Sequence, residues 1–318
     1  MKSIEGLHHV SCITKDIEKN VWFYTKVLGL KLLKKSVNQD DVFSYHIFYG
    51  DANASVGSSI TFFDYPLISP SIAGSNSVYR LGLRVATKEA LVFWRARLKS
   101  FNFKSDAIIN KLSCFGFNFT DPDGLKLRLI SSEGLDDLVS YPNNHPDIPL
   151  NFAIYGLGEV HLHVQDTLKA DQWLTTVLNF KRVMSDQDST LYISSSHRAD
   201  TRCIVTMDSS KAETYGHGSV HHIAWRVKDD EQLMVMNTRM NDLAFSNSSI
   251  VDRHYFKSLY VRDYNRILFE FATDGPGYTC DEPLETLGHH LSLPPFLEPY
   301  RKTIEKHIKP LNTKNDSL

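Results

Sequence analysis

Gly6-Leu7-His8-His9-Val10 begins a pattern that recurs three more times along this chain of 318 residues. The later copies begin with Ser77-Val78-Tyr79-Arg80-Leu81, Leu157-Gly158-Glu159-Val160 and Ser219-Val220-His221-His222-Ile223. Each copy continues as a short alternating apolar run and then reaches a residue of a type that commonly caps helices, namely Asp16, Thr87, Asp166 and Asp229. The sequence therefore predicts a strand followed by an N-capped helix, repeated four times.

The remainder of each copy predicts further strands. The amphipathic segment after Asp16 ends at Leu28-Gly29-Leu30, and the segment after Asp166 ends at Leu178-Asn179-Phe180 with the same offset, which indicates internal duplication. Runs of strand-forming residues follow at Tyr45–Tyr49 and Ser59–Phe63, Cys114–Phe119 and Leu125–Leu129, Thr190–Ile193 and Cys203–Met207, and Lys257–Val261 and Ile267–Phe271. Each copy is thus a predicted βαβββ module, and the fold class is α+β.

In chain order the four modules form two pairs. We expect one domain over residues 4–132 (modules 1 and 2) and a second over 153–274 (modules 3 and 4). Residues 133–152 are rich in Pro, Asn and Asp and predict a linker. Residues 275–318 predict a C-terminal extension with a short helix from Pro299 to about Ile308 and a disordered end from Asn312 to Leu318.

Composition excludes several classes of partner. The formal net charge of -2 offers no basic surface for nucleic acids or anionic membranes. No run of about 18 apolar residues predicts a membrane span, and Met1 to Glu5 carry no apolar leader segment. The four cysteines show no C-x-x-C spacing, which favours reduced thiols over disulfides. We therefore expect a cytoplasmic protein without nucleic-acid or membrane partners.

One position of the repeat indicates a metal site. It holds His9 in module 1 and His222 in module 4, but Arg80 and Glu159 in the middle modules. Two imidazoles and one carboxylate, with open coordination positions, suit Fe(II) that binds an organic substrate and O2 together. Alignment of the last strand of each module compares Phe62 or Phe63, Arg128, Thr206 and Glu270, of which only Glu270 can ligate. We predict a site of His9, His222 and Glu270; the alternative is that Glu270 points outward from a half-exposed strand.

Other histidines compete for this role. Strand alternation sends His8 and His221 to the face opposite His9 and His222, so only one of each pair should face the site. His161 is disfavoured but not excluded. Arg80 and Glu159 would form an ion pair if modules 1 and 4 pair around the metal and modules 2 and 3 pair around an inactive counterpart. Pairing in chain order is the alternative.

Five stretches of the chain resemble the vicinal oxygen chelate superfamily, which contains glyoxalase I, bleomycin-resistance proteins and type I extradiol dioxygenases. They are Gly6–Val10, Leu28–Leu32, Ser219–Arg226, Ile267–Asp274 and Leu293–Pro299, and they extend over nearly the whole chain. More narrowly, the chain is similar to proteins named as ring-cleaving dioxygenases and linked to methylhydroquinone and quinone resistance in low-GC Gram-positive bacteria. The resemblance implies two tandem vicinal-oxygen-chelate domains that form curved, partly open barrels.

The segment from His254 to Glu270 also resembles the extradiol dioxygenase signature, through His254, Leu259-Tyr260, Asp263 and Glu270. The chain departs from that signature at Tyr264 and Arg266, and it has Glu159 where ordinary type I enzymes have their first histidine, so His9 must substitute. By this resemblance Tyr260 and His254 are catalytic residues, as hydrogen-bond donor and acid/base. The alternative for Tyr260 is a core aromatic residue with a satisfied hydroxyl.

The resemblance implies a non-haem Fe(II) ring-cleaving dioxygenase, of extradiol type, that takes a hydroquinone- or catechol-like aromatic diol and O2 and serves in quinone detoxification. Mn(II) is the alternative metal, and a homodimer is an open alternative to a monomer. Two other functions remain as alternatives. One is a glyoxalase-type isomerase or lyase, and the other is a metal-free resistance protein that sequesters an aromatic compound.

Overall fold

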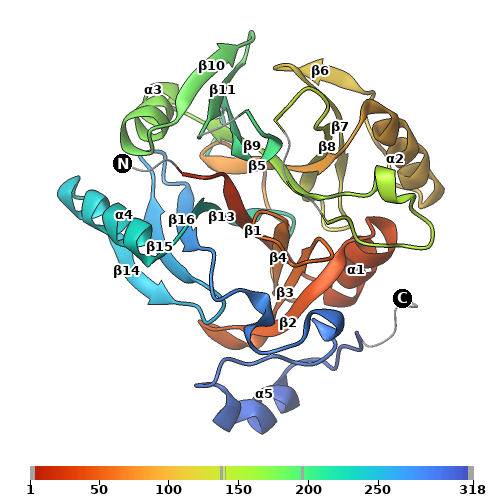
Figure 1. Cartoon of the computed structure of the whole chain (residues 1–318). Helices are drawn as coiled ribbons and strands as arrows, with labels where there is room; N and C mark the ends of the chain where they lie inside the picture. The colour runs from red at the N-terminus through yellow and green to blue at the C-terminus, as the bar shows by residue number, and fades with distance from the viewer. Residues whose placement is uncertain (1–3, 137–138, 140, 195–196, 314–318) are drawn as a thin grey trace.

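Two curved, partly open sheets of eight strands each form the centre of the molecule (Figure 1). This computed structural model describes residues 4–136, 139, 141–194 and 197–313. The strand orders are β14-β15-β16-β13-β1-β4-β3-β2 and β10-β11-β12-β9-β5-β8-β7-β6. The helices α1 to α4 lie on the outer flanks of the sheets, and α5 lies beyond β2 and β3 (Figure 1). The predicted α+β fold class is confirmed.

Each module has the predicted order of one strand, one helix and three strands. Module 1 contains β1 (Leu7–Thr14), α1 (Ile17–Trp22), its π-helical continuation η1 (Phe23–Val27), β2 (Lys31–Asn38), β3 (Asp41–Gly50) and β4 (Ser59–Asp64). Module 2 contains β5 (Ser77–Val85), α2 (Lys88–Ser100), β6 (Ile109–Lys111), β7 (Cys114–Thr120) and β8 (Lys126–Ser131). Module 3 contains β9 (Gly156–Val164), α3 (Thr167–Asp171), the π-helical η3 (Gln172–Val177), β10 (Lys181–Ser185), β11 (Ser189–Ile193) and β12 (Arg202–Met207). Module 4 contains β13 (Val220–Val227), α4 (Asp230–Asp242), β14 (Asn247–Asp252), β15 (Lys257–Arg262) and β16 (Leu268–Thr273).

The four predicted capping residues all cap their helices. Each side chain accepts a hydrogen bond from a backbone N–H of the first helical turn, where no carbonyl of the helix itself is available. Because α1 and α3 both continue as π-helices, the duplication of modules 1 and 3 extends to their helix geometry. The caps and donors are Asp16 with Lys19, Thr87 with Ala90, Asp166 with Leu168 and Lys169, and Asp229 with Gln232.

Modules 1 and 4 share one sheet and modules 2 and 3 share the other, as expected if His9 and His222 bind one metal ion. β1 pairs antiparallel with β13, so modules 1 and 4 share one sheet, and β5 pairs antiparallel with β9, so modules 2 and 3 share the other. Within each chain-order half, an arginine of one helix binds the end of the other: Arg97 donates to Val27 O at 2.9 Å and Arg239 to Val177 O at 2.8 Å. The domain limits 4–132, 133–152 and 153–274 stay a prediction, and each sheet takes one module from each half.

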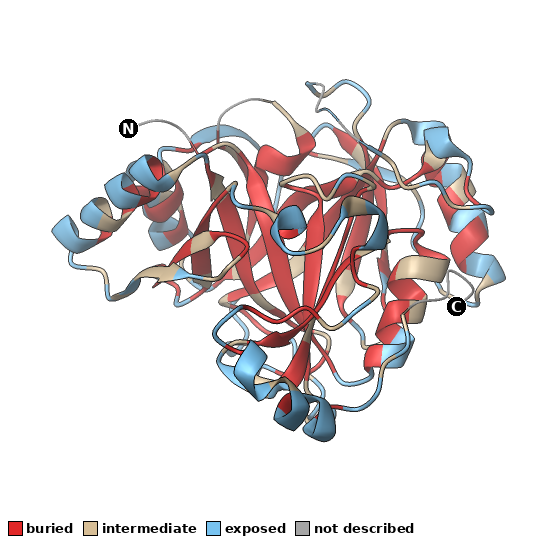
Figure 2. Cartoon of the chain, turned by 60° about the horizontal axis from the view of Figure 1, so that its bottom comes forward, coloured by how far each residue is buried: buried red, intermediate tan, exposed pale blue. Residues whose placement is uncertain are grey.

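The hydrophobic core lies between the sheets and the flanking helices (Figure 2). All eight residues of β1 are buried, because this strand lies in the middle of its sheet between β13 and β4. Trp94 of α2, Trp173 of η3 and Trp225 of β13 are fully buried. The outer faces of the helices are exposed, as their amphipathic sequences predict.

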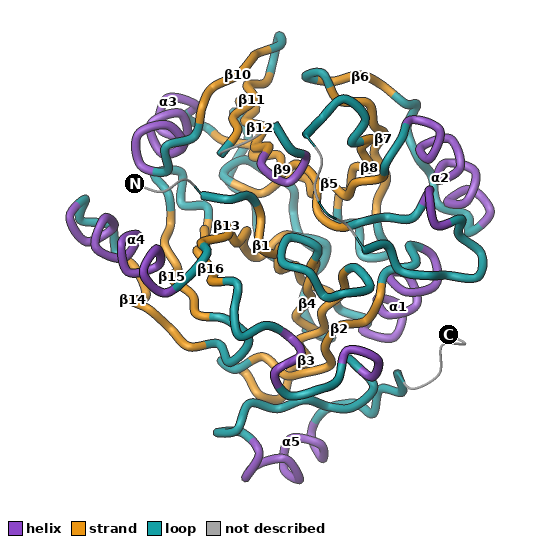
Figure 3. The backbone as a smooth tube through the Cα atoms, in the orientation of Figure 1, coloured by secondary structure: helices purple, strands orange, loops and turns teal. Residues whose placement is uncertain are grey.

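The C-terminal extension packs against module 1. Leu291 forms a parallel bridge with Lys35 of β2, and Ser36 donates from Oγ to Ser292 O at 2.7 Å. The predicted helix is present as η7 (Glu298–Tyr300) and α5 (Arg301–His307), which lie next to β3 (Figure 3). Of the predicted disordered end, residues 314–318 lie outside the described part of the chain.

Neither disulfides nor membrane helices are found in the described residues. The four cysteines are free thiols, three of them buried and Cys280 exposed. Among residues 4–136, 139, 141–194 and 197–313, no helix combines the length and apolar character that a membrane crossing needs.

Candidate metal centre

His9, His222 and Glu270 converge at the middle of the first sheet. His9 Nε2 lies 3.1 Å and His222 Nε2 lies 2.8 Å from Glu270 Oε2, and the two histidine nitrogens lie 3.4 Å apart. All three side chains are buried, and Glu270 is 0% exposed. Adjacent ligands of a transition metal, each about 2.1 Å from the ion, lie about 3 Å from one another. The three atoms therefore have the spacing of one face of an octahedron.

Strand register explains how these side chains meet. In the antiparallel pair of β1 and β13, His9 lies opposite Ala224 and His222 opposite Ser11, so the two histidines occupy symmetric positions. In the parallel pair of β13 and β16, Ala224 lies beside Glu270. A carboxylate on β16 thus reaches the same point as an imidazole on each of the two adjacent central strands.

Two β-bulges place the neighbouring histidines close to the same point. Leu7 pairs with Trp225 and His9 with Ala224, so His8 is an extra residue on β1; by the same reasoning His221 is extra on β13. A bulge interrupts the regular alternation of side chains. The expectation that His221 faces away from the site is wrong for this reason, since His221 lines the adjacent cavity. Both His8 and His221 bond to the predicted ligand next to them, and His8 does not line the cavity.

The hydrogen bonds of His8 determine which nitrogen of His9 is free. Thr273 O can only accept, so His8 Nε2, at 3.0 Å, carries the proton. Burial lowers the pKa of His8 to about 3, so His8 is neutral and its Nδ1 accepts from His9 Nδ1 at 2.8 Å. A neutral His9 that donates from Nδ1 keeps its lone pair on Nε2, which is the atom next to Glu270.

The second histidine pair repeats this arrangement. His221 Nδ1 lies 2.8 Å from His222 Nδ1, and burial, followed by the charge of His222, lowers the pKa of His221 to about 3. Burial also lowers the pKa of His222, although the adjacent carboxylate of Glu270 opposes that shift. Each of the two imidazoles that approach Glu270 is therefore oriented by a neutral histidine next to it in the sequence.

Glu270 provides the test of whether a metal fits. Ser258 Oγ donates to Glu270 Oε1 at 2.5 Å, but among the described residues Oε2 has no hydrogen-bond donor in good geometry. A buried carboxylate without a counter-charge is very costly. The orphaned oxygen beside two imidazole lone pairs fits a divalent transition metal.

A cavity of about 230 Å³ opens beside His9 and His222, which both line it. It exceeds the roughly 150 Å³ of an apolar cavity that holds benzene. Its walls combine aromatic rings with a smaller set of polar groups, as in sites for small organic ligands. The aromatic residues are Phe48, Phe63, Tyr255, Phe256 and Tyr260, and the polar ones include Ser11, Asn38, Gln39, Asp40, His46, His221 and Arg253.

Tyr260 lies on β15, directly opposite Glu270. Its ring centre is 5.7 Å from that of His222, and Arg253 donates from Nε to its hydroxyl at 3.3 Å. Asp40 holds Arg253 through two further hydrogen bonds of 3.2 and 3.0 Å. Burial, with the charge of Glu270, raises the pKa of Tyr260, so the hydroxyl keeps its proton and can donate to a ligand.

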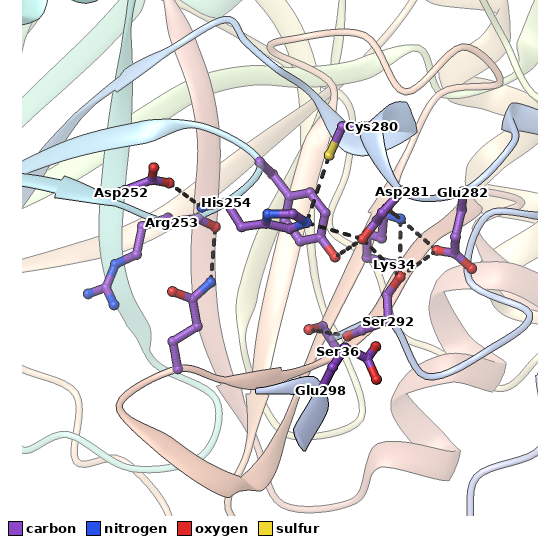
Figure 4. Close-up of polar contacts among 12 residues, drawn as sticks. Lys34, Ser36, Asp252, Arg253, His254, Cys280, Asp281, Glu282, Ser292 and Glu298 are labelled. Carbon is purple, nitrogen blue, oxygen red and sulfur yellow. Dashed lines mark hydrogen bonds and ion pairs between the residues drawn. The ribbon is translucent and has the colours of Figure 1, made fainter. Parts of the chain in front are cut away.

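His254 lies elsewhere. Its Nε2 is 3.9 Å from Cys280 Sγ and 3.4 Å from Asp281 Oδ2, and it does not line the cavity, although its neighbours Arg253 and Tyr255 do (Figure 4). The acid/base role expected for His254 stays a prediction that this placement does not support.

His46 is a cavity residue that the sequence analysis did not single out. Burial, with the charges of His9 and His222, holds its pKa well below the usual value, so the ring is neutral. Thr61 gives its hydroxyl proton to Ser11 Oγ at 2.8 Å, so His46 Nε2 donates to Thr61 Oγ1 at 2.9 Å. Strand alternation could have indicated this position, because His46 and Phe48 are two residues apart and share a face of β3. His46 also pairs with Phe63 of β4.

The corresponding position of the second sheet contains an ion-pair cluster. Glu159 lies 3.2 Å from Arg128 Nε, 3.0 Å from Arg202 Nε and 2.9 Å from His161 Nε2, and we call these four residues the Glu159 cluster. The expected Arg80–Glu159 ion pair is not among those of the described residues, because Arg128 and Arg202 occupy the carboxylate.

Strand register also corrects the sequence alignment of the last strands. Arg128 does occupy the position of Glu270, since it pairs with Gly82 as Glu270 pairs with Ala224. In modules 1 and 3 the equivalent residues are Thr61 and Ile204, rather than Phe62 or Phe63 and Thr206. Neither Thr61 nor Ile204 offers a carboxylate, so Glu270 remains the one carboxylate among the four positions.

Known proteins match the chain over nearly its whole length. The family model described as "Glyoxalase/Bleomycin resistance protein/Dioxygenase superfamily" matches residues 6–129. "Putative ring-cleaving dioxygenase MhqA" of Bacillus subtilis is 40% identical over 97% of this chain and 99% of that protein. "Chlorohydroquinone/hydroquinone 1,2-dioxygenase" of Sphingobium indicum is 25% identical over 99% of this chain and 97% of that protein. A crystal structure from Bacillus subtilis, described as a "putative dioxygenase", superposes with a TM-score of 0.91 at 30% identity and covers 99% of both chains.

Proposed function

Because the chain belongs to the glyoxalase/bleomycin resistance protein/dioxygenase superfamily, we propose that it is a metal-dependent dioxygenase that opens the ring of a hydroquinone- or catechol-like aromatic diol. The observation that carries this proposal is the convergence of His9, His222 and Glu270, of which the two histidines line an aromatic-walled cavity. The names of two relatives, a ring-cleaving dioxygenase and a hydroquinone 1,2-dioxygenase, support the same chemistry.

Fe(II) is the proposed metal, and Mn(II) is the alternative. His9 Nε2, His222 Nε2 and Glu270 Oε2 would hold it, while Ser258 fixes the second oxygen of Glu270. When bound, the metal would supply a redox-active Lewis acid with coordination positions left open toward the cavity. His8 and His221 keep the two histidine ligands in the tautomer that presents a lone pair, which is the usual contribution of outer partners in metal sites.

The cavity walls suit a phenolic ring. Phe48, Phe63 and Phe256 offer apolar and edge-on aromatic contacts, and ring pairs of this kind contribute about 0.5–1.5 kcal/mol beyond area burial. Tyr260 keeps its proton and can donate to an oxygen of the substrate, and Arg253 restricts the orientation of the Tyr260 hydroxyl. A diol would thus be held by its ring faces and by hydrogen bonds at its oxygens.

A neutral histidine in the cavity wall offers a hydrogen-bond acceptor to a substrate hydroxyl. His46 donates from Nε2 to Thr61, so its Nδ1 carries a lone pair. His46 lines the cavity. His46 can therefore accept a hydrogen bond from a hydroxyl of the diol. The proposed setting is removal of toxic hydroquinones and quinones in the cytoplasm.

The test is oxygen consumption by anaerobically reconstituted protein. Wild-type protein loaded with Fe(II) should bind about one iron per chain and consume O2 when methylhydroquinone or catechol is added. His222→Ala should bind no iron at this centre and consume no O2, since one of its three ligands is missing. Iron-loaded protein that binds the diol but leaves O2 unchanged contradicts the proposal and favours isomerase chemistry or sequestration.

A further inference from the structure

Three metal-binding side chains meet at a second point of the molecule. His254 follows β14, whereas Cys280 ends the short helix η5 (Tyr278–Cys280) and Asp281 comes directly after it. His254 Nε2 lies 3.9 Å from Cys280 Sγ and 3.4 Å from Asp281 Oδ2, and the three atoms all lie within 4.8 Å of one another (Figure 4). His254 is distant in sequence from the adjacent residues Cys280 and Asp281, so the fold brings the histidine to them.

The spacing suits a single tetrahedral ion. Ligands about 2.0–2.3 Å from zinc in a tetrahedron are about 3.3–3.7 Å from one another. The His254–Asp281 separation of 3.4 Å falls within that range, and the His254–Cys280 separation of 3.9 Å exceeds it by a few tenths of an ångström. A thiolate, an imidazole and one carboxylate favour Zn²⁺ or another thiophilic cation over Mg²⁺ and Ca²⁺.

Neighbouring groups hold Asp281 in place. Lys34, which is fully buried, pairs with Asp281 Oδ1 and with Glu282, so it occupies the oxygen that faces away from His254. Tyr255 donates from its hydroxyl to Asp281 Oδ2 at 3.0 Å, and Ser292 donates to it at 3.2 Å. Hydrogen bonds of this kind to a ligating carboxylate fix its orientation in metal sites.

A turn of the backbone orients His254. Its φ is +72°, in the left-handed region that His adopts more readily than most residues other than Gly. Its N–H donates to Asp252 Oδ1 at 2.8 Å, which stabilises this turn. The His254 and Asp281 side chains are each 21% exposed, so an ion can reach them from solvent.

We propose that His254, Cys280 and Asp281 form a second metal site, specific for Zn²⁺ or another thiophilic divalent cation, with its fourth position open to water. Binding converts the Cys280 thiol to a thiolate and releases one proton to solvent. The ion would tie the turn at His254 to the C-terminal extension, and the neighbours Arg253 and Tyr255 line the cavity of the first site. This site shares no ligand with His9, His222 and Glu270 and does not depend on the proposed function.

Co²⁺ is the probe that separates the two sites. A thiolate bound to Co²⁺ gives a ligand-to-metal charge-transfer absorption that imidazole and carboxylate ligands do not give. Wild-type protein should bind about two Co²⁺ per chain and show this absorption. Glu270→Gln should lose one ion and keep the absorption, whereas Cys280→Ser should lose one ion together with the absorption. Wild-type protein without thiolate absorption, or Cys280→Ser that retains it, overturns the proposal.

Two further variants keep the result independent of misfolding. His254→Asn should lose the absorption while retaining the wild-type circular dichroism spectrum, because Asn tolerates the left-handed backbone. Cys114→Ser should keep the absorption, since Cys114 is buried and its Sγ contacts only the backbone oxygens of Ser131 and Phe115 within hydrogen-bond distance. Loss of the absorption in Cys114→Ser would show that Cys114, and not Cys280, supplies the thiolate, and would contradict the proposal.

Discussion

The two sheets hold different chemistry at equivalent positions. In the sheet of modules 1 and 4, Glu270 lies beside His9 and His222, and its Oε2 lacks a hydrogen-bond donor in good geometry among the described residues. In the sheet of modules 2 and 3, Glu159 has Arg128 and His161 at Oε1 and Arg202 at Oε2. In the second sheet Arg128 and Arg202 balance the charge of Glu159. In the first sheet no arginine or lysine of the described residues pairs with Glu270.

The backbone geometry is retained in both sheets although the side chains differ. Val78 pairs with Leu162 and Arg80 with His161, so Tyr79 is an extra residue on β5, just as His8 is on β1. A bulge at the equivalent place in the second sheet shows that the irregularity belongs to the duplicated module and not to metal binding itself. The fold therefore brings side chains of several strands together at the middle of each sheet. The identity of those side chains decides whether they can bind a metal or form an ion-pair cluster.

The largest effect should come from removing the carboxylate of the first sheet. Glu270→Gln should abolish stoichiometric iron binding at this centre, with a loss larger than the roughly 10–100-fold that outer partners contribute. Metal analysis after anaerobic loading measures it. Glu159→Gln is the matched control in the second sheet and should bind as much iron per folded chain as wild type. Equal iron content in wild type and Glu270→Gln would contradict the assignment of Glu270 as a metal ligand.

Glu159→Gln should instead reduce stability. It leaves the buried guanidinium groups of Arg128 and Arg202 without their counter-charge, and breaking such a buried pair costs about 3–5 kcal/mol. Urea unfolding of metal-free protein gives the free energy of unfolding. Glu270→Gln, measured the same way, should lose less, since no arginine is left unpaired. A smaller loss for Glu159→Gln than for Glu270→Gln contradicts the assignment of roles.

The stability contribution of Glu159 should depend on pH. Burial raises the pKa of Glu159, but the hydrogen bond from His161 and the charges of Arg202 and Arg128 outweigh it and lower the pKa from 4.5 to about 2. Its contribution is therefore complete above pH 4.5 and is lost as pH falls through about 2. The difference in unfolding free energy between wild type and Glu159→Gln should shrink across this window. A difference that stays constant would show that the carboxylate charge is not the cause.

The outer histidines should have an intermediate effect. His8→Leu removes the acceptor for His9 Nδ1 while filling the space beside Phe256, and it should weaken metal affinity by about 10–100-fold. Competition with a metal chelator measures the affinity. Tyr79→Phe changes the equivalent bulge residue of the second sheet and should leave the affinity unchanged. Unchanged metal affinity in His8→Leu would contradict the proposal that His8 fixes the tautomer of His9.

Tyr260→Phe should have the smallest effect. The loss of one hydrogen bond of roughly 0.5–1.5 kcal/mol corresponds to about a tenfold lower kcat at most, with metal content unchanged. Steady-state oxygen uptake at varied diol concentration separates kcat from KM. A loss of iron in this variant would mean that Tyr260 supports the metal site rather than the substrate.

Local patterns predicted most of the architecture. The cap at Asp16 and its three counterparts, the βαβββ order and the convergence of His9 with His222 all follow from positions within a repeat, which depend on short-range geometry. The face assigned to His221 was wrong because alternation presumes a regular ladder, and a bulge of one residue is not encoded by hydrophobic period. The strand alignments at Thr61 and Ile204 were missed because loop lengths differ between modules.

Contacts between distant segments were beyond sequence reasoning. Arg202 reaches Glu159 from β12, and His254 meets Cys280 and Asp281 across the C-terminal extension. Nothing in the spacing of these residues signals that they are neighbours, since their proximity depends on how sheets and loops pack. The resemblance to a family signature placed His254 near the metal, whereas its backbone turn directs the ring toward the extension.

Isotope labelling of the product tests the central claim most directly. Fe(II)-loaded protein should convert methylhydroquinone under ¹⁸O2 to a ring-opened acid that carries both labelled oxygen atoms, which mass spectrometry detects, and Glu270→Gln should give none. Release of unlabelled quinone, or recovery of intact diol with no label, would contradict a ring-cleaving dioxygenase at His9, His222 and Glu270.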